Sequence, residues 1–195
     1  MVTQQFSNLL DRVRACTICQ DRLNHGVRPI IQASPKAKLL IIGQAPGLRV
    51  HESGIPWNDP SGERLRRWLK LPSEIFYDET QIAIVPMGLC YPGKGKSGDL
   101  PPRPECASLW HPQLLPAMPN VGMTLLIGQY AQNYYLSDKP KTLTETVKQW
   151  QTWAPHYLPL PHPSPRNTLW LKRNPWFEDE VVPYIRDYVH QHLKL

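Results

Sequence analysis

The segment KAKLLIIG (residues 36–43) places four consecutive large apolar side chains directly before a glycine. Similar short runs recur at QIAIVPM (81–87) and MTLLIG (123–128), and a less regular one lies at HYLPL (156–160). Continuous apolar runs of this length are typical of parallel strands that are buried on both faces. We therefore predict four strands in one central, mainly parallel sheet.

Helical patterns lie before and between these runs. Phe6, Leu9, Leu10 and Val13 form an i, i+3, i+4, i+7 stripe, which predicts an amphipathic helix over residues 3–15. Further helices are expected at 61–71, 108–118, 130–136, 144–153 and 174–193. This alternation predicts an α/β protein, a three-layer α/β/α arrangement in which helices cover both faces of a four-stranded sheet. The 195 residues suit one domain, spanning 1–195.

The three longest stretches without periodicity, 44–60, 88–107 and 161–173, each follow a predicted strand. In open α/β sheets, ligands bind outside the carboxyl ends of the strands. We therefore expect the functional residues in these three stretches.

Composition narrows the class of protein. No apolar run approaches the roughly 20 residues that cross a bilayer, and the N-terminal sequence lacks the layout of a secretory signal. We expect a soluble, cytoplasmic protein, in which disulfides are not expected.

The formal net charge of +6 favours a polyanionic partner such as nucleic acid, although a merely solvated basic surface explains the charge equally well.

The four cysteines form one close pair, Cys16 and Cys19, and one distant pair, Cys90 and Cys106. In a reducing compartment this pattern predicts four thiolates around one metal centre. Thiolate sets suit zinc or an iron–sulfur cluster, and the spacing does not separate them. Four unrelated buried thiols are the alternative.

Two further motifs lie in the predicted loops. The turn GQAPGLRVHESGIPWNDPSGERL (43–65) is rich in glycine but lacks the GxGxxG pattern of dinucleotide-binding folds, and GKGKSG (93–98) lacks the context of a nucleotide-binding loop. In PHPSPRN (161–167), three prolines stiffen a short loop that carries His162, Ser164, Arg166 and Asn167. Such a loop holds a catalytic group in place, or is an ordinary proline-rich connection.

Together these motifs resemble the uracil-DNA glycosylase superfamily, and most closely its iron–sulfur (fourth) family. The similarity lies in the two cysteine pairs, the GQAPG turn (43–47) and the HPS loop (162–164), in the same order and spacing. The longer form HPSPRN is similar to the closing motif of single-strand-selective monofunctional uracil-DNA glycosylases. The resemblance implies a [4Fe–4S] cluster on Cys16, Cys19, Cys90 and Cys106.

The resemblance also implies roles for individual residues. Trp57 falls where an aromatic ring stacks on the extruded uracil, and the loop after His162 fills the gap in the helix, with Arg166 as the best wedge. His162 suits the hydrogen-bond donor to the O2 atom of the leaving base. The residues expected to bind substrate are Gln44, Ala45, Trp57, Asn58 and Asn167, and Ser164 is expected to contact DNA.

The chain departs from that family at two positions. The acidic pair after the glycine-rich turn falls on Val50 and His51, and the asparagine that reads the uracil edge falls on Pro86. For activating the attacking water, the sequence ranks Glu52 first, His51 second and Asp59 third.

The loop between the distant cysteines carries Lys94, Lys96 and Arg103, which suit contacts to DNA phosphates or a solvated loop. The leading hypothesis is a monomeric glycosylase that removes uracil from single- or double-stranded DNA. The alternatives are a glycosylase for hypoxanthine or xanthine, and a protein that binds lesions without cleavage.

Overall fold

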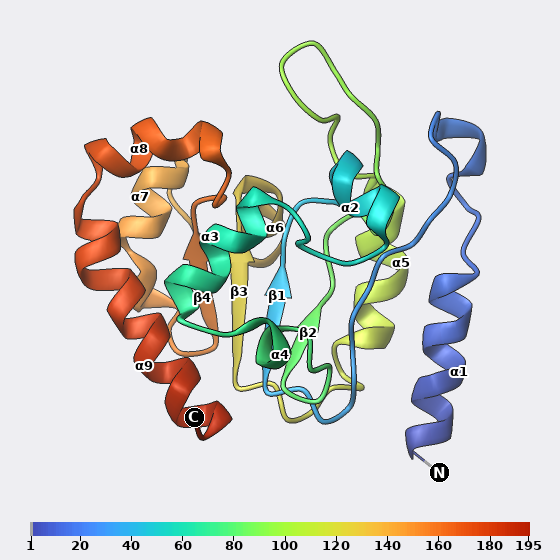
Figure 1. Ribbon diagram of the computed structural model, residues 1–195, viewed down its shortest axis with the longest axis horizontal. Helices are drawn as coiled ribbons and strands as arrows, with labels where there is room; N and C mark the ends of the chain where they lie inside the picture. The colour runs from blue at the N-terminus through green and yellow to red at the C-terminus, as the bar shows by residue number, and fades with distance from the viewer. Residues whose placement is uncertain (1) are drawn as a thin grey trace.

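The computed structural model describes residues 2–195, which form one four-stranded, fully parallel sheet (Figure 1). The strands lie in the spatial order β2-β1-β3-β4, with bounds β1 (Leu39–Ile42), β2 (Ile82–Ile84), β3 (Met123–Ile127) and β4 (Tyr157–Leu160). In β1, Leu39 is in register with Ile82 on one side and Met123 on the other. The four predicted strands and their parallel arrangement are confirmed.

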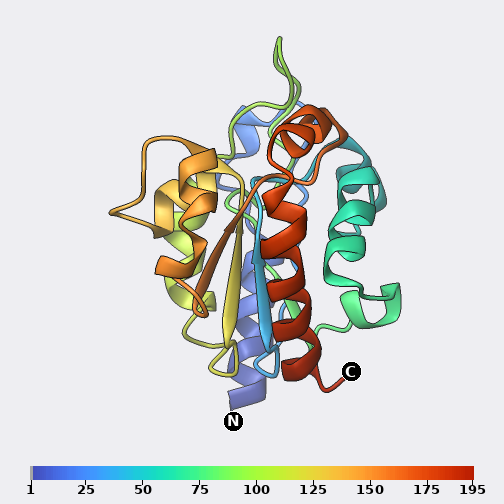
Figure 2. The same cartoon turned by 90° about the vertical axis from the view of Figure 1, so that its left-hand side faces the viewer.

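Alternate residues of the strands supply two separate cores. Leu39 and Ile41 of β1 pack into the core formed with α3 (Pro60–Leu69), α4 (Ser73–Phe76), α7 (Leu143–Lys148), α8 (Thr168–Arg173) and α9 (Val182–Leu193). Leu40 and Ile42 pack into the other core, with α1 (Val2–Arg14), α5 (Pro104–Leu114) and α6 (Gln129–Tyr135). Figure 2 shows helices on both faces of the sheet. The three-layer α/β/α arrangement is therefore confirmed.

Several helix boundaries differ from the sequence prediction. The stretch 44–60 is not irregular, because it contains α2 (Leu48–Ser53), and 161–173 contains η3 (Pro165–Asn167) and α8. The predicted helix 174–193 begins as a π-helix, η4 (Phe177–Val181), before α9. The predicted helix 144–153 ends early and continues as η2 (Trp150–Thr152), and η1 (Gln20–Arg22) follows Cys19. Elements of three to six residues are too short to display a helical period, which explains why the sequence pattern missed them.

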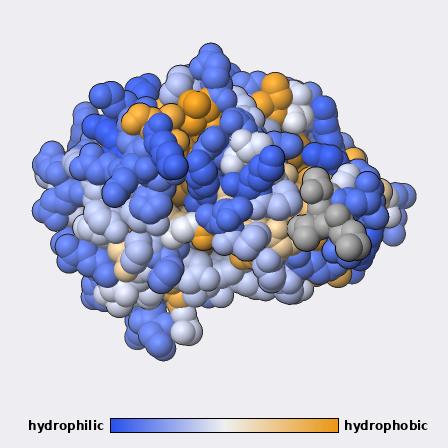
Figure 3. Space-filling view, turned by 90° about the horizontal axis from the view of Figure 1, so that it is seen from below, coloured by the Kyte–Doolittle hydropathy of each residue, from blue (hydrophilic) through white to orange (hydrophobic). Residues whose placement is uncertain are grey.

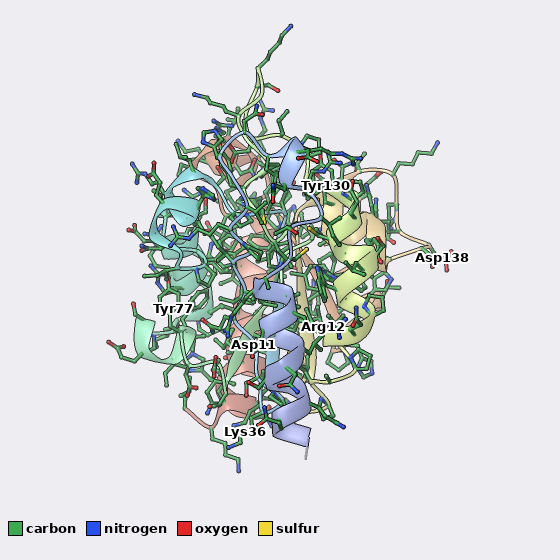
Figure 4. All side chains as sticks on the ribbon, turned by 90° about the vertical axis from the view of Figure 1, so that its right-hand side faces the viewer. Asp11, Arg12, Lys36, Tyr77, Tyr130 and Asp138 are labelled. Atoms are coloured by element: carbon green, nitrogen blue, oxygen red, sulfur yellow. The ribbon has the colours of Figure 1, made fainter. Side chains whose placement is uncertain are left out.

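The segments after β1, β2 and β4 meet at the carboxyl end of the sheet. Backbone hydrogen bonds join two of them, from Met87 N to Gly43 O (2.9 Å) and from Gly88 N to Gln44 O (2.9 Å). In Figure 1 the segment between β2 and α5 rises above the rest of the molecule as a narrow hairpin. The same hairpin projects beyond the helices in Figure 4, where Asp11 and Arg12 lie on the exposed side of α1.

The opposite end of the sheet, viewed from below in Figure 3, is covered mainly by hydrophilic residues with scattered apolar ones. Within residues 2–195, no helix has the length and apolar character needed to cross a membrane. The segments that follow β1, β2 and β4, including the projecting hairpin, lie at the other end of the sheet, its carboxyl end.

Candidate active site and cysteine cavity

A cavity of about 460 Å³ lies at the carboxyl end of the sheet, and we call it the strand-end cavity. Its walls come from the turn after β1, the segment before α3, the β2 loop (residues 91–103) and the β4 loop (residues 161–167). The lining side chains with polar or aromatic groups are Gln44, Trp57, Asp59, Ser61, Ser97, Asp99, His162, Ser164, Arg166 and Asn167. The sequence prediction that function concentrates in loops after the strands agrees with this position.

Trp57 forms an aromatic wall of the strand-end cavity. A Cβ atom at Gly43 would lie only 2.9 Å from the indole ring, and one at Gly62 would lie 1.7 Å from the Trp57 carbonyl oxygen. Arg66 Nη1 donates to that carbonyl oxygen at 3.4 Å, and Trp57 itself adopts a φ of 56°. The two glycines therefore leave the space that the ring and its backbone occupy.

His162 lies beside Trp57, with ring centroids 5.5 Å apart and ring planes inclined by 32°. Its Nδ1 atom accepts a hydrogen bond from the Ser164 backbone N–H at 3.2 Å, which places the ring proton on Nε2. Burial lowers the pKa of His162, and the negative charge of Asp59 opposes that shift. At neutral pH the ring is therefore uncharged, with Nε2–H as its donor.

The β4 loop is fixed by side chains from two elements. Asn167 Nδ2 donates to the His162 carbonyl oxygen at 2.8 Å. Arg64 of α3 donates from Nη1 to Ser164 O at 3.0 Å and from Nη2 to Thr168 Oγ1 at 3.1 Å. Arg64 was not predicted from the sequence, because only the fold brings α3 beside this loop.

Of the groups ranked for water activation, only Asp59 reaches the strand-end cavity. Glu52 is exposed and outside the lining, and its backbone carbonyl accepts from Arg28 Nη1 at 2.8 Å. His51 also lies outside the lining, where its Nε2 is 3.1 Å from the His25 carbonyl oxygen and its ring centroid is 5.9 Å from that of Tyr91. The positions of Glu52 and His51 therefore do not support their predicted roles in activating water.

α2 explains this displacement. Val50 is buried and lines the cavity, and each following helical residue is rotated by about 100° around the helix axis. The two polar side chains that follow Val50 therefore turn away from the cavity. Pro86 also lines it, so Val50 and Pro86, two of the three residues at which the chain departs from the resembling family, face this site.

Most of the residues predicted to bind substrate line the strand-end cavity. Gln44 and Ala45 do so, and Gln44 Nε2 lies 3.5 Å from the Leu100 carbonyl oxygen. Asn167 lines it too, although its amide nitrogen is engaged by the His162 carbonyl. Asn58 is exposed and absent from the lining. Asp99, which the sequence analysis did not single out, is a second carboxylate of the cavity.

The residues predicted to contact DNA separate into two groups. Ser164 and Arg166 line the strand-end cavity, and Lys94 and Lys96 are exposed on the projecting hairpin of the β2 loop. Arg103 instead pairs with Glu105, donating to its carboxylate at 2.7 and 3.2 Å. Since Arg103 lies beside the cysteines, its position does not support the predicted phosphate contact.

The four cysteines line one small cavity together with apolar side chains and Arg103, and we call it the cysteine cavity. Burial, with a smaller contribution from the neighbouring cysteines, raises the pKa of Cys90 to about 11 and that of Cys106 to about 12. Backbone N–H groups of Arg28 and Leu89 point to the sulfurs of Cys90 and Cys106 respectively. Four thiolates in such a place require a cationic centre, so the donor set fits a thiolate-bound metal group.

The described residues contain no group of three or more His, Cys, Asp and Glu side chains arranged to hold a metal ion. A single zinc draws four sulfurs to about 2.3 Å from one point. A cluster spreads its ligands, because each thiolate binds a different iron atom. Zinc and an iron–sulfur cluster therefore require different spacings of the four sulfurs.

An aromatic wall, a neutral imidazole donor and carboxylates line one cavity at the carboxyl end of the sheet on a three-layer α/β/α fold. Residues 31–186 match the family model described as the uracil DNA glycosylase superfamily. Because the match covers well over half of the chain, the protein belongs to this superfamily. It is thus a DNA glycosylase in general class, with DNA as its substrate. Cys16 and Cys19 precede the matched residues.

Proposed function

We propose that this protein is a uracil-DNA glycosylase, which hydrolyses the N-glycosidic bond of uracil flipped out of DNA and leaves an abasic site. The observation that carries the proposal is the neutral His162, whose Nδ1 accepts the Ser164 N–H and whose ring lies beside the Trp57 ring in the lining of the strand-end cavity. A neutral imidazole offers a hydrogen bond to a base without first losing a proton.

The proposed chemistry follows from the residues of the cavity. The base stacks on Trp57, and His162 Nε2–H donates to O2, where negative charge develops as the bond to the sugar breaks. The carboxylate of Asp59, close enough to influence the pKa of His162, stabilises the positive charge of the sugar. A water molecule then adds to C1′, and the released base takes up a proton.

Flipping requires contacts outside the cavity. Extruding a paired nucleotide costs a few kcal/mol. Arg166, exposed at the cavity and carried by the rigid β4 loop, is the proposed wedge. Lys94 and Lys96 on the exposed hairpin are proposed to bind phosphates, where an ammonium group contributes charge without base specificity.

The cysteine cavity is proposed to hold a [4Fe–4S] cluster through Cys16, Cys19, Cys90 and Cys106. The convergence of all four thiols and the two backbone N–H groups at the sulfurs support this assignment. The cluster would stabilise the fold, since its ligands tie the segment after α1 to both ends of the β2 loop. The monomeric state stays a prediction that the mass of the purified protein in solution will test.

Pro86 favours a second candidate, a glycosylase for hypoxanthine or xanthine. A proline offers no side-chain amide to read the uracil edge, yet this residue lines the strand-end cavity. The position of Pro86 is consistent with a different base in the cavity, or with a different side chain that recognises the uracil edge. Binding of lesions without cleavage is the remaining alternative.

The test uses purified protein with labelled single- and double-stranded oligonucleotides that contain uracil, hypoxanthine or xanthine. Alkaline cleavage then reports each abasic site. We expect strand breaks with uracil. Breaks with only hypoxanthine or xanthine would transfer the proposal to that base, and tight binding without breaks would favour the lesion-binding alternative.

A further inference from the structure

The strand-end cavity contains two carboxylates that come from different segments. Asp59 is half-buried before α3, and its Oδ1 accepts the Gly62 N–H at 2.8 Å, which caps that helix. Asp99 is exposed and comes from the β2 loop, about 40 residues further along the chain. One carboxylate is therefore committed to a helix end beside His162, whereas the other lies at the open side of the cavity.

Backbone contacts hold Asp99 over the cavity. The β2 loop closes on itself through hydrogen bonds from Leu100 N to Gly93 O (2.8 Å) and from Gly95 N to Gly98 O (2.6 Å). Arg166 Nη1 donates to Ser97 O at 3.4 Å, joining this loop to the β4 loop. None of these bonds uses the Asp99 side chain, so replacing Asp99 by asparagine leaves these bonds in place.

The Asp99 carboxylate retains free acceptor capacity. The buried Tyr91, 2% exposed, is its neighbour: burial raises the pKa of Tyr91, and the nearby Asp99 carboxylate adds to that rise. In the described part of the chain, neither of the two ion pairs includes Asp99. A carboxylate has about four acceptor positions, so several remain for other donors.

The position of Asp99 relative to the place of the base bears on where the attacking water binds. A Cβ atom at Gly47 would lie 3.6 Å from Asp99 Oδ2, so the carboxylate adjoins the turn after β1. His162 and Trp57 mark the place of the base. The incoming water has to approach C1′ from the side of the sugar opposite the leaving base. Val50 gives this wall no acid of its own.

We propose that Asp99 is a catalytic residue that binds and orients the attacking water, an inference that rests on the proposed glycosylase function. The C1′–N bond breaks and its electron pair leaves with the base, and the water oxygen then bonds to C1′. The water proton passes to the Asp99 carboxylate, which later releases it to solvent, and solvent protonates the base. Tyr91 is a positioning residue that fixes the carboxylate.

The experiment measures single-turnover base release by the full chain from an oligonucleotide with the preferred deaminated base. We expect Asp99→Asn to lower the rate roughly 10²-fold, since a positioned general base contributes about 10²–10⁴-fold, with unchanged affinity for DNA. Asp99→Ala should regain activity with added formate. Glu79→Gln, the same change at an exposed carboxylate of the α4–β2 turn, is the matched control and should match the wild type.

Tyr91→Phe should lower the rate in the wild-type background but cause no further loss in Asp99→Asn, because coupled residues are not additive. If Asp99→Asn keeps the wild-type rate while Asp59→Asn loses it, the inference about Asp99 fails and the glycosylase function stands. If the wild-type protein releases no base, both fail.

Discussion

The β4 loop and the β2 loop line the same cavity but are built in opposite ways. The β4 loop is seven residues long, contains three prolines and is held by Arg64 and Asn167. The β2 loop also contains three prolines, but it is longer, has three glycines between them, and is held mainly by its own backbone and by contacts at its root. The first presents a fixed imidazole, and the second presents an exposed carboxylate and two lysines.

This contrast separates two catalytic requirements. A donor to the leaving base has to be fixed before the base arrives, because its benefit depends on preorganisation. A group that meets water and the DNA backbone belongs at the open side of the cavity, where solvent and phosphates have access. The comparison predicts that changes in the two loops have different consequences.

The largest effect should come from detaching the β2 loop at its root. Cys106→Ser removes one of the four thiols of the cysteine cavity, so we expect loss of the cluster and of base release. Iron and sulfide analysis measures the first effect. Trypsin should then cleave faster at Lys94 and Lys96, while cleavage at Arg166 in the β4 loop stays slow.

Ser108→Ala is the matched control, because Ser108 is exposed on the same helix, two residues from Cys106. Colourless wild-type protein with one zinc ion per chain would refute the cluster. Equal acceleration of cleavage in both loops would show that the two regions are not independent.

His162→Ala tests the fixed side of the comparison. Removal of one positioned donor to a developing negative charge costs about 10²–10³-fold, so single-turnover base release should fall by roughly 10²-fold or more. DNA affinity should change little, because His162 acts on the base. His156→Ala, at an exposed histidine before β4, is the control. A variant that keeps its rate would remove His162 from the chemistry.

Arg166 connects the two loops, since its Nη1 lies 3.4 Å from Ser97 O. A wedge matters only where a DNA helix must be held open. Arg166→Ala should therefore slow base release about tenfold on duplex DNA, which corresponds to ~1.4 kcal/mol of activation free energy. On single strands the rate should change little. Arg173→Ala, at the exposed end of α8, is the control. An equal loss on both substrates would instead indicate that Arg166 acts by holding the β2 loop.

The same contrast explains what the sequence could predict. The strands were recognisable because burial on both faces requires continuous apolar runs such as LLII in β1. His162 and Trp57 were recognisable because they lie in or near the short HPS and GQAPG motifs, which carry the resemblance to the superfamily. Arg64 and Tyr91 were missed because their partners, Ser164 and Asp99, meet them only in the folded chain.

Glu52 and His51 were ranked too high for a related reason. A pattern of residue types gives the position of an acid along the chain but not the direction of its side chain on a short helix. α2 has six residues, too few for a recognisable stripe, and it directs the buried Val50 to the cavity. Asp99 reaches the same cavity from another loop, which no local pattern reveals.

The smallest effect concerns pH and acts on both regions. Burial lowers the pKa of His162 in the β4 loop and of His111, whose Nε2 donates at 3.0 Å to the carbonyl of Pro86, ahead of the β2 loop. His111 Nδ1 accepts from the Tyr135 hydroxyl. Both rings are neutral when folded, and protonation would break the bond at each Nδ1.

Below the ordinary histidine pKa of about 6.5, the unfolded chain therefore binds more protons than the folded one. The stability contributed by these neutral rings is complete above that pH and declines as pH falls toward the lowered folded pKa values. Each ring accounts for at most about 1.4 kcal/mol of unfolding free energy per pH unit. Urea unfolding between pH 7 and 5 should show this slope, and His162→Gln should reduce it by up to one proton. An unchanged slope in that variant would mean that His162 titrates alike in both states, and its role as a neutral donor would lose its basis.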